Sequence, residues 1–208
     1  MSVVDRFLQE IFDDMILKYR IDRDEWIKEL SKLGDEVFSV HELVECSHKR
    51  VMREKFPDIE RASIFNPRFI VGWLIEEAVK ARLGDGKEHK HYKIIEVDGK
   101  RYVISGFIDC VTKDGTVVEI KFLSGLYGSP HTHHILQLSL YLWILGKEEG
   151  ELLEISPEGT VGITVKAATD ETVIDLIKNP KIPRWDFECQ SCNFESFCAY
   201  SKTRERKR

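Results

Sequence analysis

The sequence contains no run of about 18 apolar residues, which is the length that a helix needs to cross a membrane. The first 19 residues lack the basic start and apolar centre of a signal peptide, and are instead acidic and amphipathic. Internal repeats, low-complexity stretches and long flexible linkers are also missing. We therefore expect a cytoplasmic protein without a membrane segment, whose 208 residues form one domain with a buried core.

The sequence also lacks an excess of basic residues, since its formal net charge is -5. This argues against a protein that coats nucleic acid nonspecifically, but it is compatible with a site in which carboxylates hold divalent metal ions. Basic residues gather at positions 48–55, including Arg50 and Arg53, and at positions 202–208. Each run can be either a solvated surface or part of a nucleic-acid contact.

Cysteine is scarce, with five residues in the chain, and a disulfide framework is not expected in a cytoplasmic protein of this size. Cys189, Cys192 and Cys198 have the spacing C-x2-C-x5-C, which is typical of metal ligands. Cys46 is the better candidate for a fourth ligand, because Cys110 lies in a predicted strand and fits a small buried core residue. Spacing alone leaves zinc and an iron–sulfur cluster open, since both accept four thiolates.

Helical patterns dominate the first part of the chain, and we expect residues 1–60 to be helical. Ser39 and Glu42 fit a capping box, so a helix should begin at the next residue and contain Cys46 about two turns later. An Asn-Pro pair then predicts a helix over 67–83, which a Gly-Asp-Gly sequence ends.

The pattern changes to alternation with a period of two after residue 90, which predicts strands. Asp-Gly pairs mark two of the turns between them. Two further helices are expected in the C-terminal half of the chain, with another hairpin between them. The expected strands cover 92–97, 101–111, 116–123, 151–155 and 159–167, and the expected helices cover 132–145 and 169–178. This order predicts an α/β fold with a mixed central sheet.

Charged and polar residues interrupt these apolar elements at four places. Glu119 and Lys121 share one face of a strand, where they need partners because the strand is otherwise apolar. Asp109 ends the preceding apolar strand, and Glu76 lies four residues after a glycine on the helix that begins at Pro67. Gln137 and Tyr141 follow at a spacing that places them on one helix face. Each motif alone is weak, but their order and spacing together are not expected by chance.

With these motifs, the chain resembles the RecB-like branch of the PD-(D/E)xK nuclease superfamily. Within that branch it resembles the small CRISPR-associated RecB-type exonucleases that carry an iron–sulfur cluster, the Cas-four family, from about Cys46 to Cys198. The resemblance implies a restriction-endonuclease-like mixed central sheet flanked by helices. It also implies cleavage of single-stranded DNA from an end, in the 5′-to-3′ sense, during CRISPR spacer acquisition, with adaptation proteins as partners.

The resemblance assigns roles to the polar motifs. It implies that Asp109 and Glu119 bind Mg²⁺ or Mn²⁺ and that Lys121 positions or activates the attacking water. Gln137 and Tyr141 would complete the motif near the DNA backbone, with Tyr141 touching DNA. The family often has histidine at the first motif where this chain has Glu76, a hard oxygen ligand that also suits these metals, although neighbouring Glu77 could serve instead.

By the same resemblance, Cys46, Cys189, Cys192 and Cys198 would hold a [4Fe–4S] cluster. The cluster would tie a helical lobe, formed by about 39–60 and 184–200, to a nuclease core of about 66–168 within a single domain. Arg50 and Arg53 would then form part of a DNA channel beside it. Homo-oligomerisation is left open.

The proposed metal site depends on the register of one hairpin. A two-residue turn at Asp114-Gly115 would pair Asp109 with Ile120 and turn it away from Glu119. A three-residue loop, 113–115, would place Asp109 directly opposite Glu119 with Gly115 in the left-handed position that such loops favour. We predict the three-residue loop or a nearby bulge.

Three other functions remain compatible with the sequence. The chain could be a RecB-type nuclease of DNA repair or recombination, a DNA-end binding module with an idle nuclease site, or a structural zinc-bound adaptor. His131, His133 and His134 precede Gln137 on the same predicted helix, and they either contact phosphate or have no functional role.

Overall fold

The computed structural model describes residues 2–16, 22–63, 67–87 and 89–203, and these form an α/β fold with two sheets. The first sheet has the order β1 (Glu36–Ser39), β3 (Lys100–Ile108), β2 (His89–Val97). The second has the order β4 (Cys110–Val111), β5 (Val117–Phe122), β6 (Glu149–Ser156), β7 (Gly159–Lys166). Each sheet mixes parallel and antiparallel pairs, so the α/β class is confirmed, but the expected single central sheet is divided in two.

The division occurs at Asp109, between β3 and β4. The side-chain Oδ2 of Asp109 accepts the backbone N–H of Ile120 at 3.0 Å. In a continued antiparallel ladder, the register would give that N–H to the carbonyl of Ile108 instead. The carboxylate therefore replaces a main-chain partner, and the strand expected over 101–111 becomes two strands.

The hairpin after β4 has the predicted three-residue loop. Cys110 pairs with Val118 and Val111 pairs with Val117, and this register places Asp109 opposite Glu119. The loop closes where Thr112 N–H donates to the carbonyl of Thr116 at 2.9 Å, and Gly115 has a φ of 87°. The prediction about this loop is confirmed.

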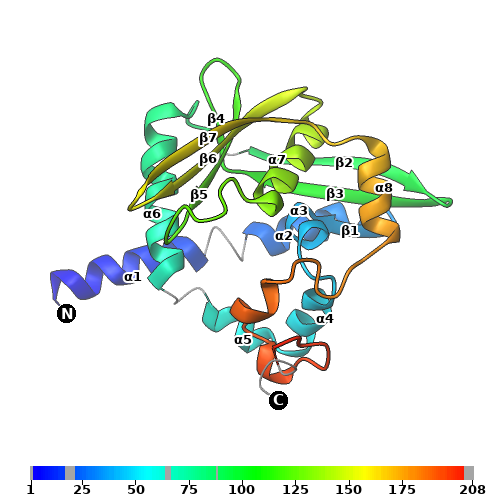
Figure 1. Ribbon diagram of the computed structural model, residues 1–208, viewed down its shortest axis with the longest axis horizontal. Helices are drawn as coiled ribbons and strands as arrows, with labels where there is room; N and C mark the ends of the chain where they lie inside the picture. Colours follow the sequence, from blue (N-terminus) through cyan, green and yellow to red (C-terminus); the bar gives the residue numbers. More distant parts are fainter. Residues whose placement is uncertain (1, 17–21, 64–66, 88, 204–208) are drawn as a thin grey trace.

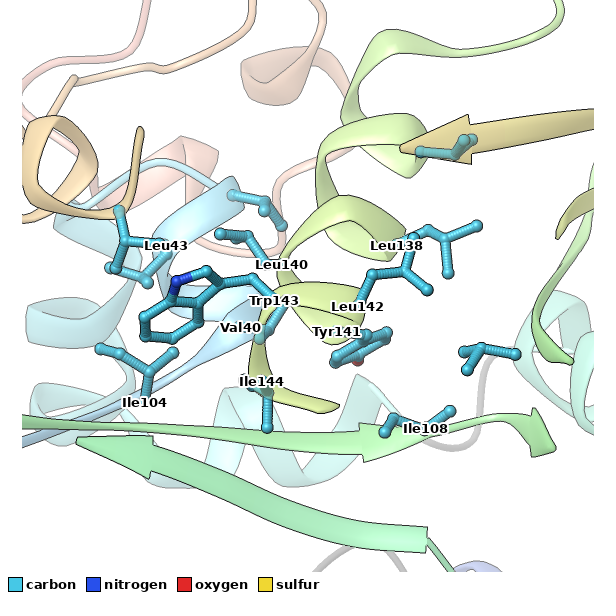
Figure 2. Close-up of a cluster of buried hydrophobic side chains, with 14 of the residues drawn as sticks. Val40, Leu43, Ile104, Ile108, Leu138, Leu140, Tyr141, Leu142, Trp143 and Ile144 are labelled. Atoms are coloured by element: carbon cyan, nitrogen blue, oxygen red, sulfur yellow. The ribbon is translucent and has the colours of Figure 1, made fainter. Parts of the chain in front are cut away.

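The central helix, α7 (Thr132–Leu145), lies between the two sheets and contacts strands of both (Figure 1). Its apolar residues face both sheets, which is why it lacks an exposed polar face over most of its length. Figure 2 shows Tyr141 and Ile144 of α7 over β3, near Ile104 and Ile108 of that strand. The same buried cluster includes residues of α3 and α8, so the core of the molecule is built around α7.

The capping box at Ser39 is present, and α3 (Val40–Val44) begins where it was predicted. The helix ends at Val44, however, so the expectation that Cys46 lies two turns into it is wrong. The expectation that the first 60 residues are all helical is also wrong, because β1 pairs in parallel with β3. Since β1 and α3 pack on β3 and α7, residues 36–44 contact the core.

The remaining helices surround these layers. Helix α6 (Pro67–Leu83) has the predicted bounds and packs on β4 and β5, while its expected N-cap, Asn66, lies outside the described residues. None of the described helices is long and apolar enough to cross a bilayer. The others are α1 (Val3–Ile16), α2 (Asp22–Leu30), α4 (His48–Lys55), α5 (Pro57–Ser63) and α8 (Asp170–Lys178).

The C-terminal segment after α8 returns to α4 and α5, at the end of the molecule opposite β4 (Figure 1). This segment contains two short 3-10 helices, Glu188–Ser191 and Glu195–Phe197. Phe197 stacks on Phe56 at 5.5 Å between ring centroids, and Tyr200 meets His48 edge-on at 4.9 Å. These contacts place the late cysteines beside the segment that follows Cys46.

Candidate functional site

Three charged residues meet where β5 passes the break between β3 and β4. Glu119 and Lys121 lie on one face of β5, and the hairpin register places Asp109 opposite Glu119. Lys121 Nζ lies 3.6 Å from Asp109 Oδ2 and contacts the Glu119 carboxylate directly. The structure therefore brings together the two acids and the lysine that the sequence singled out.

Glu119 is completely buried, and neither of its carboxylate oxygens has a hydrogen-bond partner among the described residues. Its remaining contact is the ion pair with Lys121. Burial, together with repulsion from Asp109, raises the pKa of Glu119 to about 8. A buried carboxylate whose one charged partner is Lys121 fits a divalent cation, which would satisfy its oxygens and reduce the repulsion between the two acids.

Glu76 approaches the same site from α6. Burial and the charge of Asp109 raise the pKa of Glu76, although the adjacent Lys80 opposes this shift. Lys80 forms an ion pair with Glu76 and lies 3.5 Å from the carboxylate of Glu77. Glu76 is the more enclosed of the two glutamates, with 17% of its side chain exposed against 39% for Glu77. Glu76 is the better candidate for the third carboxylate, because it is the more buried of the two glutamates and because its pKa responds to the charge of Asp109.

These residues line a cavity of about 500 Å³ between α6, α3 and the sheet break. Glu76, Lys80, Asp109 and Lys121 contribute to its wall, and His41 of α3 contributes from the opposite side. His41 is an exposed residue on the cavity wall, and desolvation by the surrounding protein together with the charge of Lys121 lowers its pKa well below the usual value. His41 is therefore a neutral imidazole that faces the carboxylate group.

Gln137 and Tyr141 lie behind this wall on α7. The Gln137 amide donates to the Tyr141 hydroxyl at 3.1 Å, and its nitrogen lies 3.3 Å from Nε2 of His41. Tyr141 has no exposed surface, and burial raises the pKa of its phenol well above the usual value. The ring lies in the hydrophobic core, and the expected contact of Tyr141 with DNA stays a prediction. Gln137 is therefore placed to position His41, and Tyr141 in turn holds Gln137.

Arg50 and Arg53, which were expected to contact DNA, are engaged with carboxylates on their own side of the molecule. Arg50 lies 3.1 Å from Glu36, and Arg53 lies 3.2 Å from Glu60 and also pairs with Glu45. A contact with DNA would have to compete with these ion pairs.

Cys46, Cys189, Cys192 and Cys198 line one hollow, and none of them forms a disulfide. Glu188 holds this hollow together, because its carboxylate accepts the backbone N–H of Cys46 at 2.7 Å and that of Arg184 at 2.8 Å. By contrast, Cys110 is buried among Val118 and Ile120, as expected of a core residue. The four remaining thiols are therefore free to act together as ligands.

No family model matches the chain. A curated relative, the CRISPR-associated exonuclease Cas4 of Saccharolobus solfataricus, is 28% identical over 172 residues, which cover 76% of this chain and 85% of that protein. The chain is therefore similar in sequence to a Cas4 exonuclease over most of its length. The solved structure of SSO0001 matches this chain with a TM-score of 0.73 and 27% identity over 79% of this chain and 87% of that one. A far weaker match is the alkaline exonuclease LHK-Exo of Laribacter hongkongensis, with a TM-score of 0.45 and 14% identity over 82% and 92% of the two chains.

Two residues of the cavity wall were missed from the sequence, His41 and Lys80. His41 lies between Ser39 and Glu42, the two residues of the capping box, and was not singled out. Lys80 follows Glu76 by four residues, a spacing that predicts an ion pair on a helix, so the sequence did contain that indication. For His41 the local sequence contained none, because only the long-range contact of α3 with α7 brings it to the cavity.

Proposed function

We propose that this protein is a Mg²⁺- or Mn²⁺-dependent exonuclease, which hydrolyses single-stranded DNA from an end in the 5′-to-3′ sense. The observation that supports this proposal best is the completely buried Glu119, whose oxygens lack hydrogen bonds beside Asp109 and Lys121. Asp109 and Lys121 line a cavity of about 500 Å³ and Glu119 is buried beside them, and two acids with an ammonium group suit the cleavage of a phosphodiester. The setting that we propose is CRISPR spacer acquisition, with adaptation proteins as partners.

Asp109, Glu119 and Glu76 are the residues that would hold the divalent metal, although their oxygens do not all lie within 4.8 Å of one another here, so the three side chains would close around the ion when it binds. When bound, the metal would neutralise the charge that builds up on the phosphate and lower the pKa of the attacking water. The carboxylates fix its place, because Asp109 is held by the backbone of Ile120 and Glu119 is held by burial. Oxygen ligands of this kind select hard cations such as Mg²⁺ and Mn²⁺.

Lys121 serves as a permanent cation in this proposal. Burial alone would lower the pKa of Lys121, but Asp109 and Glu119 raise it well above the ordinary value. The ammonium group therefore keeps its protons at neutral pH and can donate hydrogen bonds to the attacking water or to a phosphate oxygen. It orients the nucleophile rather than accepting its proton.

We further propose that the four cysteines hold a [4Fe–4S] cluster with a structural role. Although the structure describes all four residues, no three of their sulfur atoms lie within 4.8 Å of one another. A tetrahedral zinc ion, with Zn–S bonds of about 2.3 Å, would hold its sulfurs about 3.8 Å apart. The resemblance to the iron–sulfur nucleases supports the cluster, and analysis of iron and sulfide in the purified protein distinguishes it from a zinc ion.

The nuclease proposal is tested with linear and circular single-stranded DNA, in Mg²⁺ or Mn²⁺, using the protein with its cysteine site loaded. Degradation of the linear DNA alone is expected, and an end label reports its direction. The Glu119→Gln variant should lose activity at least about 100-fold, since loss of one charge-stabilising group has effects of 10²–10³ in kcat.

The matched control is Glu151→Gln, which changes an exposed glutamate on the neighbouring strand β6. This variant should cleave as the unchanged protein does. Absence of cleavage by a folded, loaded protein would contradict the nuclease proposal and favour a DNA-end binding module. Cleavage of the circle as well would add an endonuclease activity, and cleavage without association with adaptation proteins would favour a role in repair.

A further inference from the structure

The histidine cluster at the start of α7 surrounds a buried carboxylate. Glu154 of β6 has no exposed surface, and His131 Nδ1 lies 3.2 Å from each of its oxygens. His134 Nδ1 lies 2.6 Å from Oε1 of the same carboxylate. His131 is the N-cap residue of α7, so the helix direction places His134 one turn later on the same side.

We propose that His131, His134 and Glu154 form a second metal site, which binds a divalent transition-metal ion such as Zn²⁺. One ligand atom from each residue lies within 4.8 Å of the other two, and in the described part of the chain no other three histidine, cysteine or acidic residues meet this condition. Two imidazole nitrogens and one carboxylate are a donor set that transition metals use. Mg²⁺ prefers oxygen ligands alone, so the chemistry of this site differs from that of the carboxylate site.

The surroundings of the cluster meet the other requirements of such a site. The backbone N–H of His131 donates to Glu154 Oε1 at 3.0 Å, which fixes the carboxylate. The Ser129 hydroxyl is buried near Glu154 without a hydrogen bond of good geometry, and it is available to a water on the ion. Burial favours the neutral imidazoles that metal binding needs. Moving each imidazole proton from Nδ1 to Nε2 would turn both Nδ1 atoms into ligands.

The second site is separate from the candidate nuclease site but lies on the same sheet face. Its three residues do not line the cavity of Asp109 and Lys121. Lys121 and Glu154 are nevertheless register partners on the parallel strands β5 and β6, so their side chains leave the sheet on the same side. An ion held by three protein ligands keeps a coordination position for water or a phosphate oxygen, and the partly exposed His131 side chain leaves a route to it.

The experiment counts Zn²⁺ bound per chain by dialysis and metal analysis, and identifies its ligands by X-ray absorption at the zinc edge. All proteins carry Asp109→Asn and Glu119→Gln, which silence the carboxylate site, and are purified with the cysteine site loaded. His131→Gln and His134→Gln, each of which keeps a polar side chain near Glu154, should each lose one equivalent of Zn²⁺ and the imidazole signature. The result does not depend on nuclease activity.

His133→Gln is the matched control. His133 is the neighbouring imidazole in the chain, but it packs on Phe187 at 4.8 Å between ring centroids and does not belong to the triad. This variant should keep the equivalent of Zn²⁺. Equal Zn²⁺ content in all proteins would overturn the proposal. Circular dichroism checks the fold of each variant. If His134→Gln does not fold, the zinc content of His131→Gln tests the proposal, because the His131 side chain is partly exposed and its replacement should be tolerated.

Discussion

The ionisation of Glu119 should oppose folding when no divalent cation balances it. Its folded-state pKa of about 8 lies above the ordinary value of 4.5, so the unfolded chain releases this proton first as the pH rises. The free energy of unfolding of chelated protein should therefore fall between about pH 4.5 and about pH 8, with a limiting slope of about 1.4 kcal/mol per pH unit from this group. Urea unfolding in EDTA at several pH values measures this slope.

Glu119→Gln provides the reference for that measurement, because glutamine keeps the shape of the side chain without its charge. The variant should lack the slope, and added Mn²⁺ should stabilise the unchanged protein at pH 8 more than the variant. Identical pH profiles for the two proteins in EDTA would show that the burial of Glu119 is not coupled to its ionisation.

At the scale of elements, the loop at 113–115 sets the register that brings Asp109 to Glu119. Gly115 has a φ of 87°, where a side chain is strained, so Gly115→Ala should reduce the free energy of unfolding by about 1 kcal/mol. The strain can also be relieved by a change of loop, which would turn Asp109 away and reduce cleavage. Thermal unfolding and the cleavage assay measure the two effects.

Gly162→Ala is the matched control for the loop. Gly162 lies in β7, its φ is ordinary, and an added Cβ would meet nothing within 4 Å. This variant should keep both stability and cleavage. If Gly115→Ala behaves in the same way, the loop does not control the site.

Most elements of the chain could be predicted because their patterns are local. Helix α6 has a proline start and α7 is a long apolar segment that ends at a glycine, so their bounds follow from neighbouring residues. Strand β1 could not be predicted in this way. It has four residues, and its parallel partner β3 lies more than 60 residues later, so its pairing depends on tertiary contacts. The break at Asp109 was missed because it depends on one side chain replacing a main-chain partner.

The candidate site follows the same division. Asp109, Glu119 and Lys121 could be placed together by counting along one hairpin, because a three-residue loop leaves a single register. His41 and Glu154 could not be placed, since each reaches its partners through packing on α7 from distant segments. The burial of Tyr141 was missed for a related reason. Sheets cover α7 on both sides, and this packing cannot be predicted from the sequence of the helix alone.

At the scale of the whole molecule, the four cysteines should act as one cofactor site. Cys46→Ser and Cys189→Ser should each lower the iron and sulfide content of the purified protein and destabilise the segment that packs on α4. Cys110→Ala is the control, since Cys110 is buried in a separate small cluster and should leave the iron content unchanged. Retention of iron in Cys46→Ser would remove Cys46 from the site. Iron analysis and the visible absorption spectrum measure these outcomes.

The hydrogen bond from Cys46 to Glu188 joins residues 142 positions apart. At synthesis rates of about 5–20 residues per second, the ribosome adds Glu188 about 7–28 s after Cys46. Every strand of both sheets is made in that interval or before it. The nascent chain can therefore assemble its carboxylate centre while Cys46 still waits for its partners. The proposed cofactor, which needs all four thiols, would be inserted only after both sheets have been synthesised.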